Sequence, residues 1–152
     1  HLERIGRGAE AIAAALGWVE EDQRELLRLA AALHDIGKIA IPEHILHKPA
    51  KLSDDEYREV QRHAALGAEL LESSGLLRHL APLVRFHHER WDGLGYPDGL
   101  RGDAAPLGAR IIAVCDTIET MATGMRPRKK AVRSATSQPP PRRAIRVRPA
   151  WP

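Results

Sequence analysis

The chain has 152 residues, of which 43% are hydrophobic and 28% are charged. This length corresponds to about one domain, and the composition is close to that of an average globular protein. The sequence has no run of about 18 apolar residues, which argues against a helical membrane protein. The single cysteine, Cys115, excludes an internal disulfide and favours a reducing, cytoplasmic location. No secretory signal is visible at the N-terminus. Because the first residue is not Met, we expect a fragment of a longer protein.

Charge is distributed unevenly along the chain. The first 119 residues contain 14 Lys and Arg against 20 Asp and Glu, whereas residues 120–152 contain nine Lys and Arg and no acidic residue. Six of the eleven prolines also lie in this second part. We therefore expect a folded domain over residues 1–123 and a disordered, basic, Pro-rich tail over residues 124–152. Nucleic-acid binding by the tail is not favoured, since only Trp151 offers a ring for base stacking there.

Helical periodicity dominates the first half of the predicted domain. Apolar residues recur at helical spacing from Leu2 to Leu16, and Gly17 follows as a stop signal. A second stripe of apolar residues at helical spacing begins near Asp22, and the helix that it predicts is expected to end near Gly37. The sequence from Ser53 to Glu56 is a capping box, which predicts a third helix running to about Leu71.

The second half continues the pattern. Pro82 suits the first turn of a short helix that would run to His87 and His88. Residues 91–106 are rich in Gly, Asp and Pro and predict a loop, and a last helix is expected from Leu107 to about Gly124. No strand is indicated, so the sequence predicts an all-α bundle of about five helices.

Histidine and aspartate recur at positions that would face the inside of this bundle. A single histidine on an apolar face is more often a core residue than a metal ligand, but several on successive helices favour a metal site between the helices. Three other histidines, His44, His47 and His79, fall in loops or at a helix start and are expected to be solvated. The inward-facing candidates are His1, His34, Asp35, His63, His87, His88 and Asp116.

Two segments carry a resemblance to a known family. The sequence HDIGK, from His34 to Lys38, resembles the signature of the HD superfamily of metal-dependent phosphohydrolases. The sequence HHERWDGLGYPDGL, from His87 to Leu100, resembles the diagnostic segment of its HD-GYP branch. The similarity extends from His1 to about Met121. HD-GYP domains are bacterial cyclic di-GMP phosphodiesterases, usually placed behind a receiver or sensor domain.

The resemblance implies a role for each candidate residue. Asp35 would bridge two metal ions and, with Lys38, would form the catalytic pair. Lys38 would contact the scissile phosphate, and Arg126 would also contact the ligand. The loop Gly95-Tyr96-Pro97 would face the substrate. The implied metal ligands are His1, His34, Asp35, His63, His87, His88 and Asp116.

The implied reaction is hydrolysis of cyclic di-GMP to pGpG. Whether pGpG is then cleaved to GMP is left open by the sequence. Two divalent ions would lower the pKa of a bound water and hold the phosphoryl oxygens, and a third ion is not decided by the sequence. Mixed histidine and carboxylate ligands favour Fe or Mn. Two alternatives remain open, namely hydrolysis of another nucleotide and a catalytically impaired signalling module with the same fold.

The resemblance weakens after Asp116. The family continues to an Arg-Pro-Tyr sequence, whereas this chain has Arg126-Pro127 one residue late and Arg128 in place of the tyrosine. The family's closing helices are replaced by the basic tail, which a shifted reading frame would explain. Loss of those helices would expose apolar surface, and association into a homodimer through that surface is therefore one expectation.

Overall fold

The computed structural model describes residues 2–18 and 20–123. The regular elements in these ranges are helical, and the only β pairing described there is an isolated antiparallel bridge between Asp92 and Arg101. The predicted all-α class is confirmed. The predicted tail over residues 124–152 lies outside the described residues. The α-helices are α1 (Leu2–Ala15), α2 (Glu21–Leu33), α3 (Glu43–Leu46), α4 (Asp54–Gln61), α5 (His63–Ser73), α6 (Ala81–Arg85) and α7 (Leu107–Ala122), and the 3-10 helices are η1 (Ile36–Ala40), η2 (Arg78–Leu80) and η3 (Gly102–Ala104).

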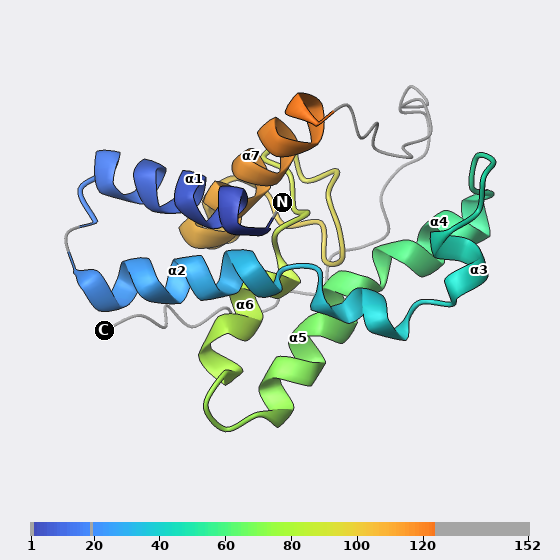
Figure 1. Ribbon diagram of the computed structural model, residues 1–152, viewed down its shortest axis with the longest axis horizontal. Helices are drawn as coiled ribbons and strands as arrows, with labels where there is room; N and C mark the ends of the chain where they lie inside the picture. The colour runs from blue at the N-terminus through green and yellow to red at the C-terminus, as the bar shows by residue number, and fades with distance from the viewer. Residues whose placement is uncertain (1, 19, 124–152) are drawn as a thin grey trace.

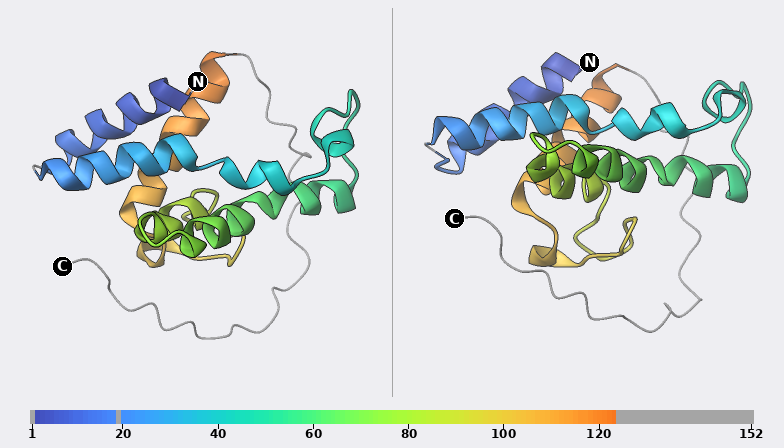
Figure 2. Two further views of the ribbon diagram at one scale, coloured as in Figure 1. Left: turned by 60° about the horizontal axis from the view of Figure 1, so that its bottom comes forward. Right: turned by 90° about the horizontal axis from the view of Figure 1, so that it is seen from below.

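The helices pack around one apolar core. α1 contacts both α2 and α7, and the short α6 contacts α2, α5 and α7 (Figure 1). The side chains of Ile5, Leu27, Val84 and Ile112, which come from four different helices, are almost completely buried in this core. α3 and α4 extend away from the bundle as an arm, as the two further views in Figure 2 show. The core therefore lies on one side of the molecule and the arm on the other.

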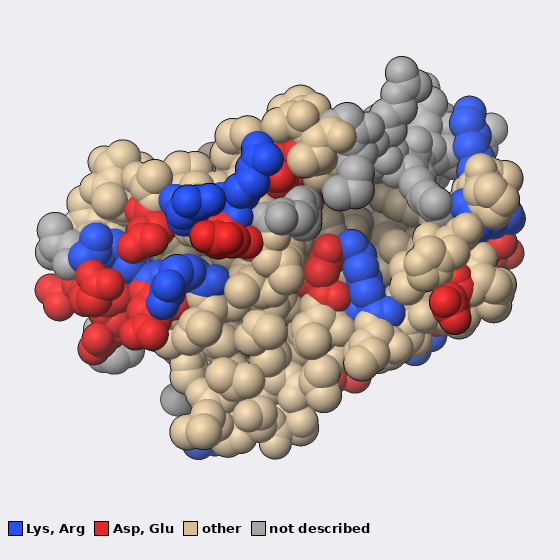
Figure 3. All heavy atoms as spheres, in the orientation of Figure 1, with Lys and Arg blue, Asp and Glu red and all other residues tan. Residues whose placement is uncertain are grey.

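Small residues allow α1 and α2 to pack closely. On α1 the buried residues Ala9 and Ala13 follow Ile5 at intervals of four, and Ala30 and Ala31 are buried on α2. The outer faces of both helices carry mixed acidic and basic side chains (Figure 3), including the ion pair between Arg28 and Glu25. Such exposed pairs contribute little stability, so burial of the apolar faces holds this pair of helices together. None of the helices in the described ranges has the length and apolar character needed to span a bilayer.

The helix predicted to start after Ser53 does form, but it is divided. Ser53 Oγ accepts the backbone N–H of Glu56 and the Glu56 side chain accepts the N–H of Ser53, which confirms the capping box. The helix is then interrupted at Arg62. Nδ1 of His63 lies 2.6 Å from the Val60 carbonyl oxygen. We attribute the interruption to this contact, because the imidazole N–H competes for a carbonyl that a continuous helix would use internally.

Other helix boundaries also differ from the prediction. α2 ends at Leu33 and the chain continues as the 3-10 turn η1, instead of remaining α-helical to near Gly37. α6 ends at Arg85, so His87 and His88 follow the helix and do not lie within it. The short helix α3 was not predicted, although His44 within it and His47 directly after it are exposed as expected. The loop predicted over residues 91–106 is confirmed, with η3 inside it.

A close contact between two glycines places η1 against α5. A Cβ atom built on Gly37 would lie 2.0 Å from the backbone oxygen of His63 and 2.5 Å from the backbone nitrogen of Gly67. Both distances are far below van der Waals contact, and both neighbours are backbone atoms that cannot rotate away. Only glycine at position 37 therefore allows the turn that follows Asp35 to contact α5.

We expect substitution of Gly37 by alanine to destabilise the protein by more than about 2 kcal/mol, since the added methyl group forces η1 and α5 apart. Urea denaturation followed by circular dichroism measures the change. Gly75→Ala is the matched control, because an added Cβ there has no neighbour within 4 Å. Its free energy of unfolding should change by no more than about 0.5 kcal/mol. Equal stability of the two variants would contradict this account of the contact.

Candidate metal centre

Three buried imidazoles share one hydrogen-bond arrangement. His34, His63 and His87 are each no more than 1% exposed. In each, Nδ1 lies 2.6–2.7 Å from the backbone carbonyl oxygen three residues earlier in the chain. A carbonyl can only accept, so Nδ1 carries the proton and Nε2 is left with a lone pair. This tautomer is the one in which a histidine binds a metal ion through Nε2.

The lone pairs point toward one another and toward a carboxylate. Nε2 of His63 lies 3.4 Å from Nε2 of His87 and 3.3 Å from Oδ1 of Asp35. Burial lowers the pKa of His87 to about 3, and burial also lowers the pKa of His63, so both rings are neutral at physiological pH. Acceptor atoms that face each other at this distance repel unless a cation lies between them. The chemistry of this donor set therefore fits a bound divalent ion.

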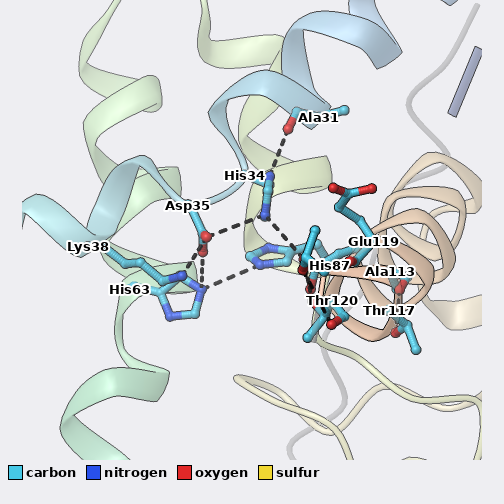
Figure 4. A network of polar contacts seen from close by, with 12 residues as sticks. Ala31, His34, Asp35, Lys38, His63, His87, Ala113, Thr117, Glu119 and Thr120 are labelled. Atoms are coloured by element: carbon cyan, nitrogen blue, oxygen red, sulfur yellow. Dashed lines mark hydrogen bonds and ion pairs between the residues drawn. The ribbon is translucent and has the colours of Figure 1, made fainter. Parts of the chain in front are cut away.

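Asp35 occupies the middle of the cluster. One of its oxygens, Oδ1, faces His63, while the other, Oδ2, lies 3.5 Å from Nε2 of His34 (Figure 4). Lys38, one turn later in η1, donates a hydrogen bond to Oδ2. Burial acts to raise the pKa of Asp35, but the electrostatic influence of the neighbouring His34 ring and the charge and hydrogen bond of Lys38 outweigh it and hold this pKa below its usual value. The carboxylate is thus ionised and directs one oxygen to each of two histidines.

His88 completes the first group of ligand atoms. One donor atom from each of Asp35, His63, His87 and His88 lies within 4.8 Å of the others. The His88 ring stacks at a tilt on His87, with ring centroids 4.0 Å apart. These residues come from the end of the segment before η1, from α5 and from the segment after α6, and η1 and α6 both pack against α5.

Asp116 lies near His34, the histidine that faces Oδ2 of Asp35. Its Oδ1 is 3.9 Å from Nε2 of His34 and accepts a hydrogen bond from Thr120 one turn later on α7. Beside it, Glu119 of α7 forms an ion pair with Arg4 of α1 at 3.1 Å. His34 and Asp116 therefore form a second group that shares Asp35 with the first.

The structure brings six of the seven predicted ligands together. The seventh, His1, lies outside the described residues, as does Arg126, so neither can be placed. His44, His47 and His79 are exposed and lie on the surface, which confirms the sequence-based expectation.

The predicted substrate loop lies against the ligand segment. The Tyr96 ring packs on His88 at a centroid distance of 4.7 Å, and the Tyr96 N–H donates to the His88 carbonyl. Burial raises the pKa of the Tyr96 phenol, and the nearby Asp35 carboxylate adds to the effect. A Cβ on Gly95 would lie 2.4 Å from the backbone nitrogen of Arg90, so Gly95 allows the loop to pack directly on the chain that follows the histidines. The peptide bond between Tyr96 and Pro97 is cis.

Glu89 is a residue of this region that the sequence analysis did not single out. The residue is only 6% exposed, and its side chain accepts the backbone N–H groups of Asp98, Gly99 and Leu100 at 2.7–3.0 Å. Burial raises the pKa of Glu89, while the three N–H donors act in the opposite direction. The sequence held one signal, namely an acidic residue directly after two candidate ligands, but its partners ten residues later were not visible.

Comparison with known proteins gives a consistent assignment. A family model described as an HD domain matches residues 1–138, which extends into the region predicted to be the tail. The chain is 47% identical over 132 residues to the cyclic di-GMP phosphodiesterase response regulator RpfG of Xanthomonas campestris pv. campestris, covering 86% of this chain and 34% of that protein. It is 41% identical over 123 residues to a cyclic di-GMP phosphodiesterase of Thermotoga maritima, covering 80% and 33%.

A relative with a different printed substrate is also similar. The chain is 38% identical over 123 residues to the 3′3′-cGAMP-specific phosphodiesterase 2 of Vibrio cholerae, covering 80% of this chain and 23% of that protein. The chain thus spans about a quarter to a third of the length of these relatives. The HD family match covers most of the sequence, and it agrees with the helical fold and with the motifs around His34 and His87. The chain belongs to the HD domain family.

Proposed function

We propose that this chain is the phosphodiesterase domain of a cyclic di-GMP hydrolase. The observation that carries the proposal is the position of Asp35, whose two oxygens face His63 on one side and His34 on the other. This arrangement suits a carboxylate that bridges two metal ions. The two relatives named as cyclic di-GMP phosphodiesterases support the choice of substrate.

The proposed ligands divide into two groups around Asp35. His63, His87 and His88 would hold one ion, and His34 with Asp116 would hold the other. The sequence resemblance adds His1 to the second group. Nitrogen and oxygen donors in this mixture favour Fe or Mn over Mg²⁺. When bound, such ions lower the pKa of a water and neutralise the charge of a phosphodiester.

The protein's own side chains would orient the substrate. Lys38 is 43% exposed at its side chain and hydrogen-bonded to Asp35, so its ammonium group would be available to contact a phosphate oxygen bound next to the ions. Gly95, Tyr96 and Pro97 would border the same space from the loop, and Arg126 would contribute from the chain after α7. In the net reaction, water adds across one P–O3′ bond and the 3′-oxygen leaves with a proton, giving linear pGpG.

A second candidate substrate is 3′3′-cGAMP. It is favoured by the similarity to the Vibrio cholerae enzyme named for that dinucleotide. The two substrates share the cyclic phosphodiester ring and differ in one base, so the same proposed centre would serve either of them.

The surrounding architecture is also proposed. We place the catalytic domain at residues 1–123 and the basic tail after it. The name of the Xanthomonas relative, a response regulator, supports a receiver domain elsewhere in the full-length protein. A cytoplasmic location and a homodimer remain predictions from the sequence.

Product analysis tests the proposed reaction. After reconstitution with Fe²⁺ or Mn²⁺, the chain should convert cyclic di-GMP to pGpG, detected by chromatography, and 3′3′-cGAMP should be tested in parallel under identical conditions. Faster cleavage of 3′3′-cGAMP would select the second substrate. Failure of a metal-loaded chain to cleave either dinucleotide would overturn the proposed activity.

Metal analysis tests the bridging role of Asp35. We expect the purified chain to bind about two divalent ions and Asp35→Ala to lose both, because each group of ligands shares this carboxylate. Asp103→Ala is the control, since Asp103 is an exposed loop residue paired with Arg110 and should retain the wild-type metal content. Two ions bound by Asp35→Ala would rule out the bridging geometry.

Substitution of Lys38 separates catalysis from metal binding. Lys38→Met should reduce kcat about 100-fold, the typical cost of removing one group that stabilises transition-state charge, while the metal content stays near wild type. Lys51→Met is the control, because Lys51 is exposed on the segment before α4. A Lys38→Met enzyme with wild-type kcat would show that this cation does not contact the reacting phosphate.

A further inference from the structure

A buried carboxylate joins the ligand segment to the loop that borders it. Glu89 directly follows His87 and His88, and its side chain accepts three successive backbone N–H groups from Asp98, Gly99 and Leu100. Oε1 accepts the first two of these and Oε2 accepts the third. All three contacts are made by donors, so every one of them needs an oxygen at this position.

The loop requires a particular backbone to present these donors. Gly99 has φ of +68°, a conformation that favours glycine, and it places three successive N–H groups on one side. Arg85 reaches the same loop from the other side and donates to both carboxylate oxygens of Asp98 at 2.8 and 3.1 Å. Of the two side chains that hold this loop, that of Glu89 belongs to the more buried residue, which is 6% exposed.

Tyr96 lies in the chain between the ligand segment and the residues that Glu89 holds. The Tyr96 ring contacts His88, and Asp98, the first of the three residues that donate to Glu89, follows two positions later. The Tyr96 ring is 6.4 Å from His63 and 4.7 Å from His88, measured between ring centroids, and so lies beside the first group of proposed ligands. Without Glu89, the loop would keep the packing of Gly95 on the backbone of Arg90 but would lose the three hydrogen bonds at residues 98–100.

We propose that Glu89 is a positioning residue that fixes residues 96–100, and with them the Tyr96 ring, beside the metal centre. Its effect on substrate rests on the proposed function, whereas its effect on the loop does not. The carboxylate is specifically required. A glutamine would present one oxygen and one NH₂ group to three N–H donors, so that at least one donor would face another donor.

Amide hydrogen exchange tests the attachment without substrate. In the full, metal-loaded chain, Glu89→Gln should raise the exchange rates of the Asp98, Gly99 and Leu100 amides at least about tenfold, the effect of losing about 1.4 kcal/mol of protection. Asp103→Asn, which alters an exposed carboxylate of the same loop, should leave these rates unchanged. Equal protection in Glu89→Gln and wild type would overturn the proposal.

Kinetics with cyclic di-GMP tests the consequence. Glu89→Gln should raise KM several-fold with a smaller change in kcat and with wild-type metal content, since the ligands remain and the loop is displaced. A loss of metal in proportion to activity would show that Glu89 acts on the ligands instead, and would overturn the positioning role. If wild type cleaves no dinucleotide, the proposed function fails while the exchange result still decides the attachment.

A second variant tests the same attachment independently, so that misfolding of Glu89→Gln would not leave the proposal untested. Gly99→Val keeps Glu89 intact but strains the backbone at positive φ and displaces the N–H donors. It should reproduce the faster exchange and the higher KM. Wild-type exchange and KM in Gly99→Val would count against the attachment as strongly as they would in Glu89→Gln.

Discussion

The hydrogen bond from a histidine Nδ1 to the carbonyl three residues earlier is the interaction on which this structure depends. It occurs at His34, His63 and His87, each within two residues of the end of a helix. Carbonyls at helix ends lack internal donors, so the imidazole satisfies a group that would otherwise require water. The same bond fixes the tautomer and turns Nε2 inward. Helix termination and ligand orientation therefore have one cause.

Packing converts these local arrangements into a shared centre. The absence of a side chain at Gly37 lets the turn after Asp35 touch the backbone of α5, beside Gly67 and His63. This contact keeps η1 against α5, with Oδ1 of Asp35 3.3 Å from Nε2 of His63. The apolar core supports the arrangement, since Leu27 and Val84 are buried in α2 and α6, the helices that precede His34 and His87. The centre thus depends on backbone approach as much as on the identity of its polar residues.

The sequence predicted most of the centre and fewer of the boundaries. Inward-facing positions of His34, His63 and Asp116 followed from helical spacing, and the capping box at Ser53 was correct because capping depends on neighbouring residues only. The interruption at Arg62 was missed, because it arises when a side chain competes for a backbone carbonyl. The role of Glu89 was missed because its partners are defined by the path of a loop, which periodicity does not describe.

The candidate ligands come from α5, α7 and the segments that follow α2 and α6, so residues more than 80 positions apart in the sequence meet at one point. An ion bound there would cross-link these segments. Occupancy and folding then become linked equilibria, in which each favours the other. The abundance of the folded domain in a cell would accordingly follow the supply of the metal as well as the rate of synthesis.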